Sequence, residues 1–465
     1  MRNTPSQNSF LKSFWRALRD QRGVSAVAFA ITFAVLAPMT MATFDVYQIN
    51  EQRGKLQDAL DAAALYAARS SATDTPGVNT IGNKALTANL QLIPGATLQS
   101  SSFTLDTTGD AKVVAVAAVR VPALAPDAFT HNPVTVNSEV TRAGNNVEVA
   151  LVLDNTGSMS GSPIASLQSA ANQLIDLVIS PTQTPYYSKM AIVPYSNSVN
   201  AGAYAATVRG ALQGGTNGTA GINTNPPSTN FKFTNANGSN VTFASSTCVS
   251  ERTGAQAFTD ASYTTAKVGL AYPPPSSSGN NCINAKIQPL TSDKTALKSI
   301  ISTLTANGST AGHVGVAWGW YMISPNWASL FPTASQPAAY GTPHLLKVMI
   351  LMTDGAFNTD YCNGVISKDS GSGSGSSSDH INCNAPNGNS FVQAQALCTA
   401  MKAAPNNVIV YTVGFLHQGP DPSAQAILNN CATDAQHAYF PTTGSDLQVV
   451  FQQIGADLQK LRLSH

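Results

Sequence analysis

Residues 147–159 read VEVALVLDNTGSM, an apolar run that ends in an acidic and hydroxyl-rich turn beginning at Asp154. Such a continuous apolar run predicts a strand buried on both faces, as in a parallel sheet. A helical pattern follows at once (IASLQSAANQLIDLVIS), and further strands and helices alternate to the C-terminus, including LLKVMILMTDG at 345–355 and NVIVYTVGF at 407–415. The alternation predicts an α/β domain with a parallel central sheet covered by helices on both faces.

Polar side chains stand where these apolar strands end. Asp154, Thr156 and Ser158 follow the first strand, Asp354 follows the strand at 345–353, and Thr310 precedes a predicted helix. Ligands of open α/β sheets bind outside the carboxyl ends of the strands, so these groups are candidates for one site. Two carboxylates with neutral hydroxyls are hard oxygen ligands that suit Mg²⁺ or Mn²⁺ rather than Zn²⁺. The alternative is a turn that only caps a helix.

Charge and cysteine content exclude several classes of protein. The 465 residues carry 25 Lys+Arg and 24 Asp+Glu, a net charge of +1, so no strong positive field is available to attract nucleic acid. All six cysteines lie in the second half and none forms a Cys-x-x-Cys pair, which favours disulfides in an exported region over a zinc site. Of the possible pairings we favour Cys248 with Cys282, Cys362 with Cys383, and Cys398 with Cys431.

Residues 24–44 form an uncharged run of 21 residues, VSAVAFAITFAVLAPMTMATF. A helix of this length crosses about 30 Å of hydrocarbon. Five basic residues precede the run against the single acid Asp20: Arg2, Lys12, Arg16, Arg19 and Arg22. The positive-inside rule therefore predicts a cytoplasmic N-terminus and one crossing. A cleaved secretory signal ending near 40–42 ranks second, because the run is longer than a usual signal core and the helical pattern continues beyond it.

The helical pattern extends over about 14–69, with an apolar stripe along 46–67. This stripe either contacts a partner helix or packs against the next unit of the chain. A short helix is expected near 84–92, and β-branched alternating runs over 102–140 predict a small β-rich unit.

The chain thus divides into a basic stub at 1–23, a transmembrane helix at 24–44 and a helix extension at 45–70. A small α+β unit at 71–143 and an α/β domain at 144–465 follow. Stretches rich in Gly, Asn, Ser and Thr at about 201–290 and 363–390 are expected to be surface insertions. We also expect His313 to lie at the surface at a helix start, and Trp318, Trp320 and Trp327 to belong to the core or a packed loop.

The polar residues at the strand ends resemble the metal-ion-dependent adhesion site of von Willebrand factor A domains, Asp-x-Ser-x-Ser with a distant Thr and a distant Asp. Thr156 replaces the first Ser and keeps its hydroxyl, while Thr310 and Asp354 match the distant residues. RGVSAVAFAITFAVLAPM and LQDALDAAALYAA resemble the TadE/TadG-type segment. VALVLDNTGSM, WGWYMISPNW and YTVGF resemble TadG-like proteins of the tight-adherence (Flp) pilus apparatus, and the helix with its β-rich unit resembles pilin architecture.

This resemblance implies a Rossmann-like von Willebrand factor A domain in a bacterial inner-membrane protein, with its main domain periplasmic or extracellular. It implies a role in pilus assembly or adhesion, in which Mg²⁺ or Mn²⁺ would be held by five residues: Asp154, Thr156, Ser158, Thr310 and Asp354. An acidic residue of an envelope or pilus protein would complete the metal site. Two alternatives stay open, a structural scaffold and a metal-dependent hydrolase. We expect no enzyme, because the sequence has no Gly-x-Ser-x-Gly elbow, Walker loop or second carboxylate cluster.

Overall fold

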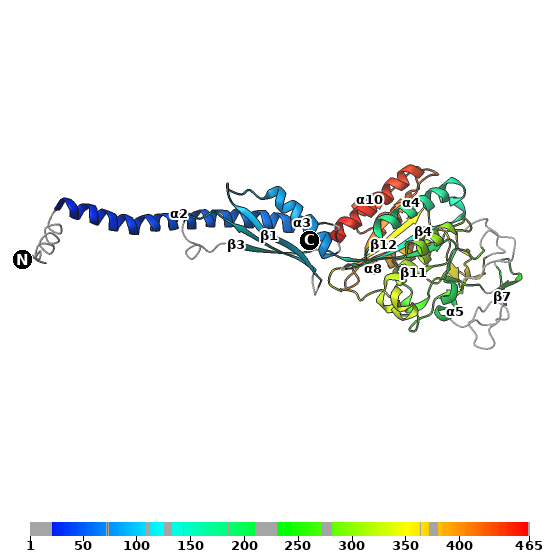
Figure 1. Cartoon of the computed structure of the whole chain (residues 1–465). Coiled ribbons are helices and arrows are strands. Elements are labelled where there is room, and N and C mark those ends of the chain that lie inside the picture. The colour runs from blue at the N-terminus through cyan, green and yellow to red at the C-terminus, as the bar shows by residue number, and fades with distance from the viewer. Residues whose placement is uncertain are drawn as a thin grey trace, which may run out of the picture. The chain divides into compact units, whose positions relative to one another are not determined.

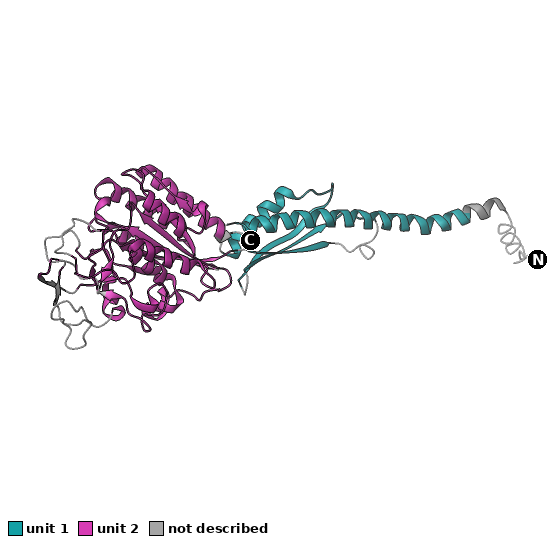
Figure 2. Cartoon of the chain, turned by 180° about the vertical axis from the view of Figure 1, so that it is seen from behind, with its two compact units in different colours: residues 1–143 teal, residues 144–465 magenta. Residues whose placement is uncertain are grey.

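A computed structural model of the chain describes residues 21–463, apart from 71, 73, 108–110, 125–132, 143, 185, 210–229, 236, 245, 271–280, 363 and 372–379. Most of the predicted basic stub and of the SGSGSGSSS segment therefore lies outside the described residues. The chain divides into two compact units, residues 1–143 and 144–465, which Figure 2 colours separately. Each unit has its own hydrophobic core.

The first unit begins with the long helix α2 (Gln21–Ala68), which contains Pro38. From Val27 onward this helix is long and apolar enough to cross a membrane, and it is the one helix of the described chain that meets this criterion. Its large apolar side chains between Val27 and Phe44 are exposed. The second half of α2 is different, because Leu56, Leu60, Ala63 and Ala67 are fully buried in the core of this unit. The predicted apolar stripe therefore packs against the chain's own small unit.

That small unit consists of α3 (Thr75–Asn89) and an antiparallel meander of β1 (Thr97–Asp106), β2 (Lys112–Arg120) and β3 (Val134–Thr141). The meander lies along the second half of α2 (Figure 1). The predicted helix at 84–92 was placed too late. It begins at Thr75 because the Asp74 side chain accepts a hydrogen bond from Gly77 N, and a proline occupies the first turn.

The second unit is built on a mixed sheet whose centre is parallel. β4 (Asn146–Asp154) pairs in parallel with β5 (Ser188–Tyr195) on one side and with β12 (Leu345–Thr353) on the other. β15 (Ile409–Gly414) and β16 (Ala438–Tyr439) continue the parallel order beyond β12. β11 (Gln288–Thr291) pairs antiparallel with β5. The chain leaves the sheet at the carboxyl end of β5, and β11 re-enters from that same end and therefore runs in the opposite direction. The order β11-β5-β4-β12-β15-β16 is the doubly wound one, so the predicted α/β class is confirmed.

Helices cover both faces of this sheet, as the alternating side chains of β4 require. Val149, Leu151 and Leu153 face the core formed with α4 (Ser162–Val178), α6 (Lys294–Ser302) and α10 (Gly444–Leu463). Ala150 and Val152 face the core formed with α7 (Gly312–Ile323), α8 (Ser390–Lys402) and α9 (Pro422–Cys431). In Figure 1, α4 and α10 lie together over one side of the sheet and α8 lies on the other.

The polar stretch at about 201–290 is only partly a surface insertion. β6 (Val199–Asn200), β9 (Cys248–Ser250) and β10 (Gly269–Leu270) extend the main sheet beyond β5, and Val249, Val268 and Ile283 belong to the core. The remaining elements are α5 (Ala205–Val208) and two hairpins, β7 (Asn230–Thr234) with β8 (Asn240–Ala244) and β13 (Tyr361–Cys362) with β14 (Val365–Ile366).

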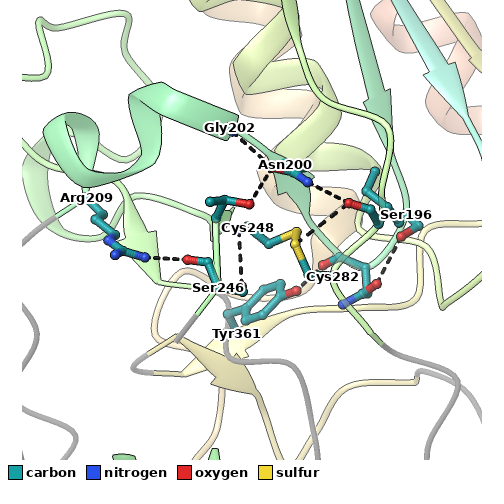
Figure 3. The surroundings of a disulfide bond; sticks show 11 residues. Ser196, Asn200, Gly202, Arg209, Ser246, Cys248, Cys282 and Tyr361 are labelled. Carbon is teal, nitrogen blue, oxygen red and sulfur yellow. Dashed lines mark hydrogen bonds between the residues drawn. A yellow bond between two sulfur atoms is a disulfide. The ribbon is translucent and has the colours of Figure 1, made fainter. Parts of the chain in front are cut away.

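All three predicted disulfides are present: Cys248–Cys282, Cys362–Cys383 and Cys398–Cys431. The first ties the insertion beside β6, where Asn200 donates to Ile283 O and accepts from Gly202 N (Figure 3). The third joins α8 to α9, the two helices that flank β15, as expected.

Candidate metal centre

The two carboxylates of the predicted site stand at the ends of neighbouring strands. Asp154 is the last residue of β4, and Asp354 directly follows β12. These strands are parallel, with Leu153 opposite Met352. Parallel strands end at the same edge of a sheet, so the register places Asp154 level with Thr353, one residue before Asp354.

Thr156, Ser158 and Asp354 form a continuous chain of oxygen atoms. The Thr156 and Ser158 hydroxyls lie 3.0 Å apart, and the Ser158 hydroxyl donates to Asp354 Oδ1 at 2.8 Å. The turn that carries them is a single 3-10 turn, Gly157–Met159, which aims both hydroxyls back at the sheet edge. The side chains of three of the five predicted residues are thus linked by hydrogen bonds.

Three hydrogen bonds from neighbouring groups hold the Asp154 carboxylate in place. Its Oδ1 accepts from Thr156 N at 2.9 Å, and its Oδ2 accepts from the hydroxyls of Thr353 and Tyr195 at 2.7 and 3.1 Å. Complete burial, followed by the charge of Asp354, raises the pKa of Asp154 to about 7. A cation beside both carboxylates would relieve this repulsion.

The loop that carries Thr310 lies against the turn after β4 through backbone hydrogen bonds. Gly157 N donates to Gly308 O at 2.8 Å and Asn307 N donates to Asn155 O at 2.9 Å, so the loop before α7 lies against the turn after β4. Thr310 N in turn donates to Asn358 Oδ1 at 2.8 Å. The backbone of Thr310 is therefore fixed between the Asp154 turn and the segment after Asp354.

Three contacts of the site were missed by the sequence analysis. Thr353 and Tyr195 support Asp154, and His417 Nε2 lies 3.2 Å from Asp354 Oδ2. Each of these residues ends a strand of the central sheet or closely follows one, so the position of the strand ends was the available signal. What the sequence could not give is which strand lies next to which.

His313 lies at the start of α7, as predicted, but the expectation that it lies at the surface was wrong. His313 is 1% exposed, and its Nε2 lies 2.6 Å from Glu251 Oε2. It is buried because Glu251, the residue that directly follows the inserted strand β9, lies against the start of α7. The tryptophan prediction is confirmed, since Trp318, Trp320 and Trp327 are fully buried.

The donor set fits a hard divalent cation. Octahedral Mg²⁺ has metal–oxygen bonds of about 2.0–2.1 Å, which places adjacent ligand oxygens about 2.9 Å apart. The separations along Thr156, Ser158 and Asp354, 3.0 and 2.8 Å, are those of ordinary hydrogen bonds and are also compatible with this ligand spacing. Within the described ranges there is no group of three or more His, Cys, Asp and Glu side chains placed to hold a metal, so the candidate depends on hydroxyls as well as carboxylates.

Comparisons with known proteins found several similar solved structures of low sequence identity. The chain resembles the von Willebrand factor domain of the type V pili tip protein Mfa5 from Porphyromonas gingivalis, with 11% identity, 69% of this chain and 98% of that chain covered, and a TM-score of 0.37. It also resembles the pilus adhesin SpaC from Lactobacillus rhamnosus GG, with 12% identity, coverage of 80% and 36%, and a TM-score of 0.35. The chain therefore spans about a third of that adhesin's length.

A third similar structure is proximal thread matrix protein 1 from the mussel byssus with a zinc-occupied MIDAS motif, at 11% identity, coverage of 67% and 45%, and a TM-score of 0.30. No curated protein matches the sequence.

The N-terminal segment gives the more particular finding. Residues 23–70 match the family described as "Putative Flp pilus-assembly TadE/G-like". This match covers the apolar helix and its extension, and together with the α/β unit it fits a TadG-like protein. The TadE/TadG-type resemblance of this segment is thereby confirmed, and the match supports a pilus-related role for a membrane-anchored, single-pass chain.

Proposed function

We propose that the chain is a membrane-anchored component of the Flp/Tad pilus apparatus that binds an envelope or pilus protein in a metal-dependent manner. The observation that carries this proposal is the oxygen chain from Thr156 through Ser158 to Asp354 at the common end of β4 and β12. Nothing in this arrangement calls for turnover, so we propose a binding protein rather than an enzyme.

In this proposal Thr156, Ser158 and Asp354 hold Mg²⁺ directly, and Asp154 and Thr310 hold it directly or through water. Mg²⁺ commonly retains positions for outside ligands, so a bound ion would attract an acidic side chain of the partner. The protein's own contribution is preorganisation. Thr353 and Tyr195 fix Asp154, and the Gly157–Gly308 hydrogen bond keeps the Thr310 loop against the turn.

Calorimetry of Mg²⁺ binding to the full chain in detergent tests the ligand set with a matched pair of variants. Thr156→Ser keeps the hydroxyl and should retain wild-type affinity. Thr156→Val keeps the shape without the hydroxyl and should lower the affinity about tenfold or more. Asp154→Ala should abolish Mg²⁺ binding, because it removes one of the two carboxylates.

Metal-dependent capture of envelope proteins by the same variants then separates binding from scaffolding. Capture that needs Mg²⁺ and fails with Asp154→Ala supports the proposal. Capture that is equally strong with Asp154→Ala and in chelator would replace it with the scaffold. Metal-dependent turnover of phosphate or peptide substrates would point to the hydrolase.

A further inference from the structure

A cluster of apolar residues, here called the collar, lies against α2 where its exposed apolar stretch ends. Phe44, the last residue of that stretch, is 51% exposed. Leu124, which follows β2, is 68% exposed, although its backbone N–H donates a hydrogen bond to Asp45, the residue after Phe44 in α2. Pro122, two residues before Leu124, and Pro94, from the segment between α3 and β1, are exposed beside them. Three segments far apart along the chain thus present apolar side chains beside the same stretch of the helix.

The first acidic residue of α2 does not interrupt this surface. Asp45 is 2% exposed, and its Oδ2 accepts a hydrogen bond from Leu124 N at 2.9 Å. The carboxylate is turned inward and is paired with a backbone donor. The collar therefore stays apolar where α2 changes from a lipid-compatible helix to a packed one.

The collar contains a groove of about 340 Å³. Its apolar lining is Phe44, Ile93, Pro94, Pro122, Ala123 and Leu124. Asp45 and Gln48 supply its polar lining, and no Lys or Arg takes part among the described residues. An apolar groove with a few polar groups at one end matches the chemistry of a phospholipid at the depth of its glycerol region.

We propose that this collar is a phospholipid-binding surface that seats the small unit in the interfacial layer of the membrane. The argument for lipid over a protein partner is continuity. The uncharged run that ends at Phe44 is 21 residues long, and 21 residues just span about 30 Å of hydrocarbon, which places Phe44 and the collar at the edge of the bilayer. Exposed apolar patches mark interaction sites, and in this placement the lipid bilayer lies directly beside the collar.

Leu65 provides a matched control within the same unit. It is also an exposed leucine, at 44%, but it lies 20 residues beyond Asp45, which is about 30 Å further along the helix axis. If the bilayer edge lies at the collar, Leu65 is far outside the membrane whichever side the unit faces.

The experiment introduces Leu124→Trp or Leu65→Trp into the full chain, reconstituted in phosphatidylcholine vesicles with or without bromine on the upper acyl chain. The wild type, with its four tryptophans, gives the background. Side chains in the interfacial layer lie within about 10 Å of the acyl boundary, so the emission added at position 124 should fall by about half or more. The emission added at position 65 should not change.

Equal quenching at the two positions, or none at either, would overturn the proposal. Both substitutions are at exposed sites, and α2 is retained in both variants. Preserved circular dichroism and vesicle incorporation confirm that the comparison is between folded, inserted proteins. Loss of quenching at position 124 on addition of envelope proteins alone would identify a protein as the occupant instead.

Discussion

Asp154 shows how one residue links the fold to the candidate site. It is fully buried at the end of β4, yet the chain keeps a carboxylate there beside a second one. Its position could be predicted, because an apolar run ending in Asp marks a strand end. Its support by Tyr195 and Thr353 could not, since those contacts depend on which strands become neighbours.

The raised pKa of Asp154 predicts a pH-dependent stability in the absence of metal. The folded state holds this proton up to about pH 7, whereas the unfolded chain releases it near its ordinary value of 3.8. Stability should therefore fall as the pH rises from about 4 to 7, by at most roughly 4 kcal/mol. Asp154→Asn should remove this dependence, so the variant should lose less stability between pH 5 and pH 8.

Denaturant unfolding in chelator at pH 5 and pH 8 measures this difference. Adding Mg²⁺ at pH 8 should restore stability to the wild type in proportion to site occupancy and leave Asp154→Asn unchanged. Parallel pH profiles for the two proteins would contradict the assigned charge environment of Asp154.

Helices and strands could be predicted where the local pattern of apolar residues in the sequence agrees with their burial in the fold. β4, β12 and β15 are continuous apolar runs, and all three are central parallel strands. The insertion was misjudged because its polar composition hides short segments that add strands to the sheet. Cys248 and Val249 are buried through pairing with β6, a contact made across residues that the local pattern does not connect.

The Cys248–Cys282 disulfide should stabilise the edge of the candidate site. Ser196, near β6, accepts a hydrogen bond from Ala311 N at 2.8 Å, beside Thr310. Replacing both cysteines by Ala should lower the free energy of unfolding by about 3 kcal/mol and speed amide exchange over 196–200.

Replacing Cys398 and Cys431 by Ala is the matched control. The sequence separations are 33 for this pair and 34 for the first, so the loss of chain constraint is similar. This pair joins α8 and α9, so exchange over 196–200 should stay slow. Equal acceleration in both variants would refute a local role for Cys248–Cys282. Hydrogen exchange with mass spectrometry reports both quantities.

Two helical glycines of the first unit give a second test at this scale. A Cβ on Gly82 of α3 would lie 2.4 Å from the Phe103 ring, whereas a Cβ on Gly54 of α2 meets nothing within 4 Å. Gly82→Ala should destabilise the unit by about 1–3 kcal/mol, because the ring must move. Gly54→Ala should stabilise it by up to about 1 kcal/mol through helix propensity. Limited proteolysis of the first unit should rank the variants in this order, and a Gly82→Ala protein as resistant as wild type would contradict the close packing.

The whole molecule combines two units with different requirements. The first exposes an apolar helix long enough to cross a membrane, and the second carries the candidate site at a sheet edge built from its own residues. The division could be anticipated from the sequence, because alternating β-branched runs give way after residue 144 to apolar strands that alternate with helices. The orientation of the chain in the membrane depends on the basic residues before the apolar run, most of which lie outside the described residues.

The last prediction concerns that orientation. Five basic residues precede the apolar run against one acid, so the N-terminus should remain in the cytoplasm and both folded units should be exported. A reporter active only in the periplasm should be active when fused after residue 145 and inactive when fused at residue 12. Replacing Arg16, Arg19 and Arg22 by Glu should weaken this bias, whereas the same number of Lys→Glu changes beyond residue 280 should not. The opposite reporter pattern in the wild type would reverse the orientation and place the disulfide-bonded unit in a reducing compartment, where its three disulfides would not be expected to persist.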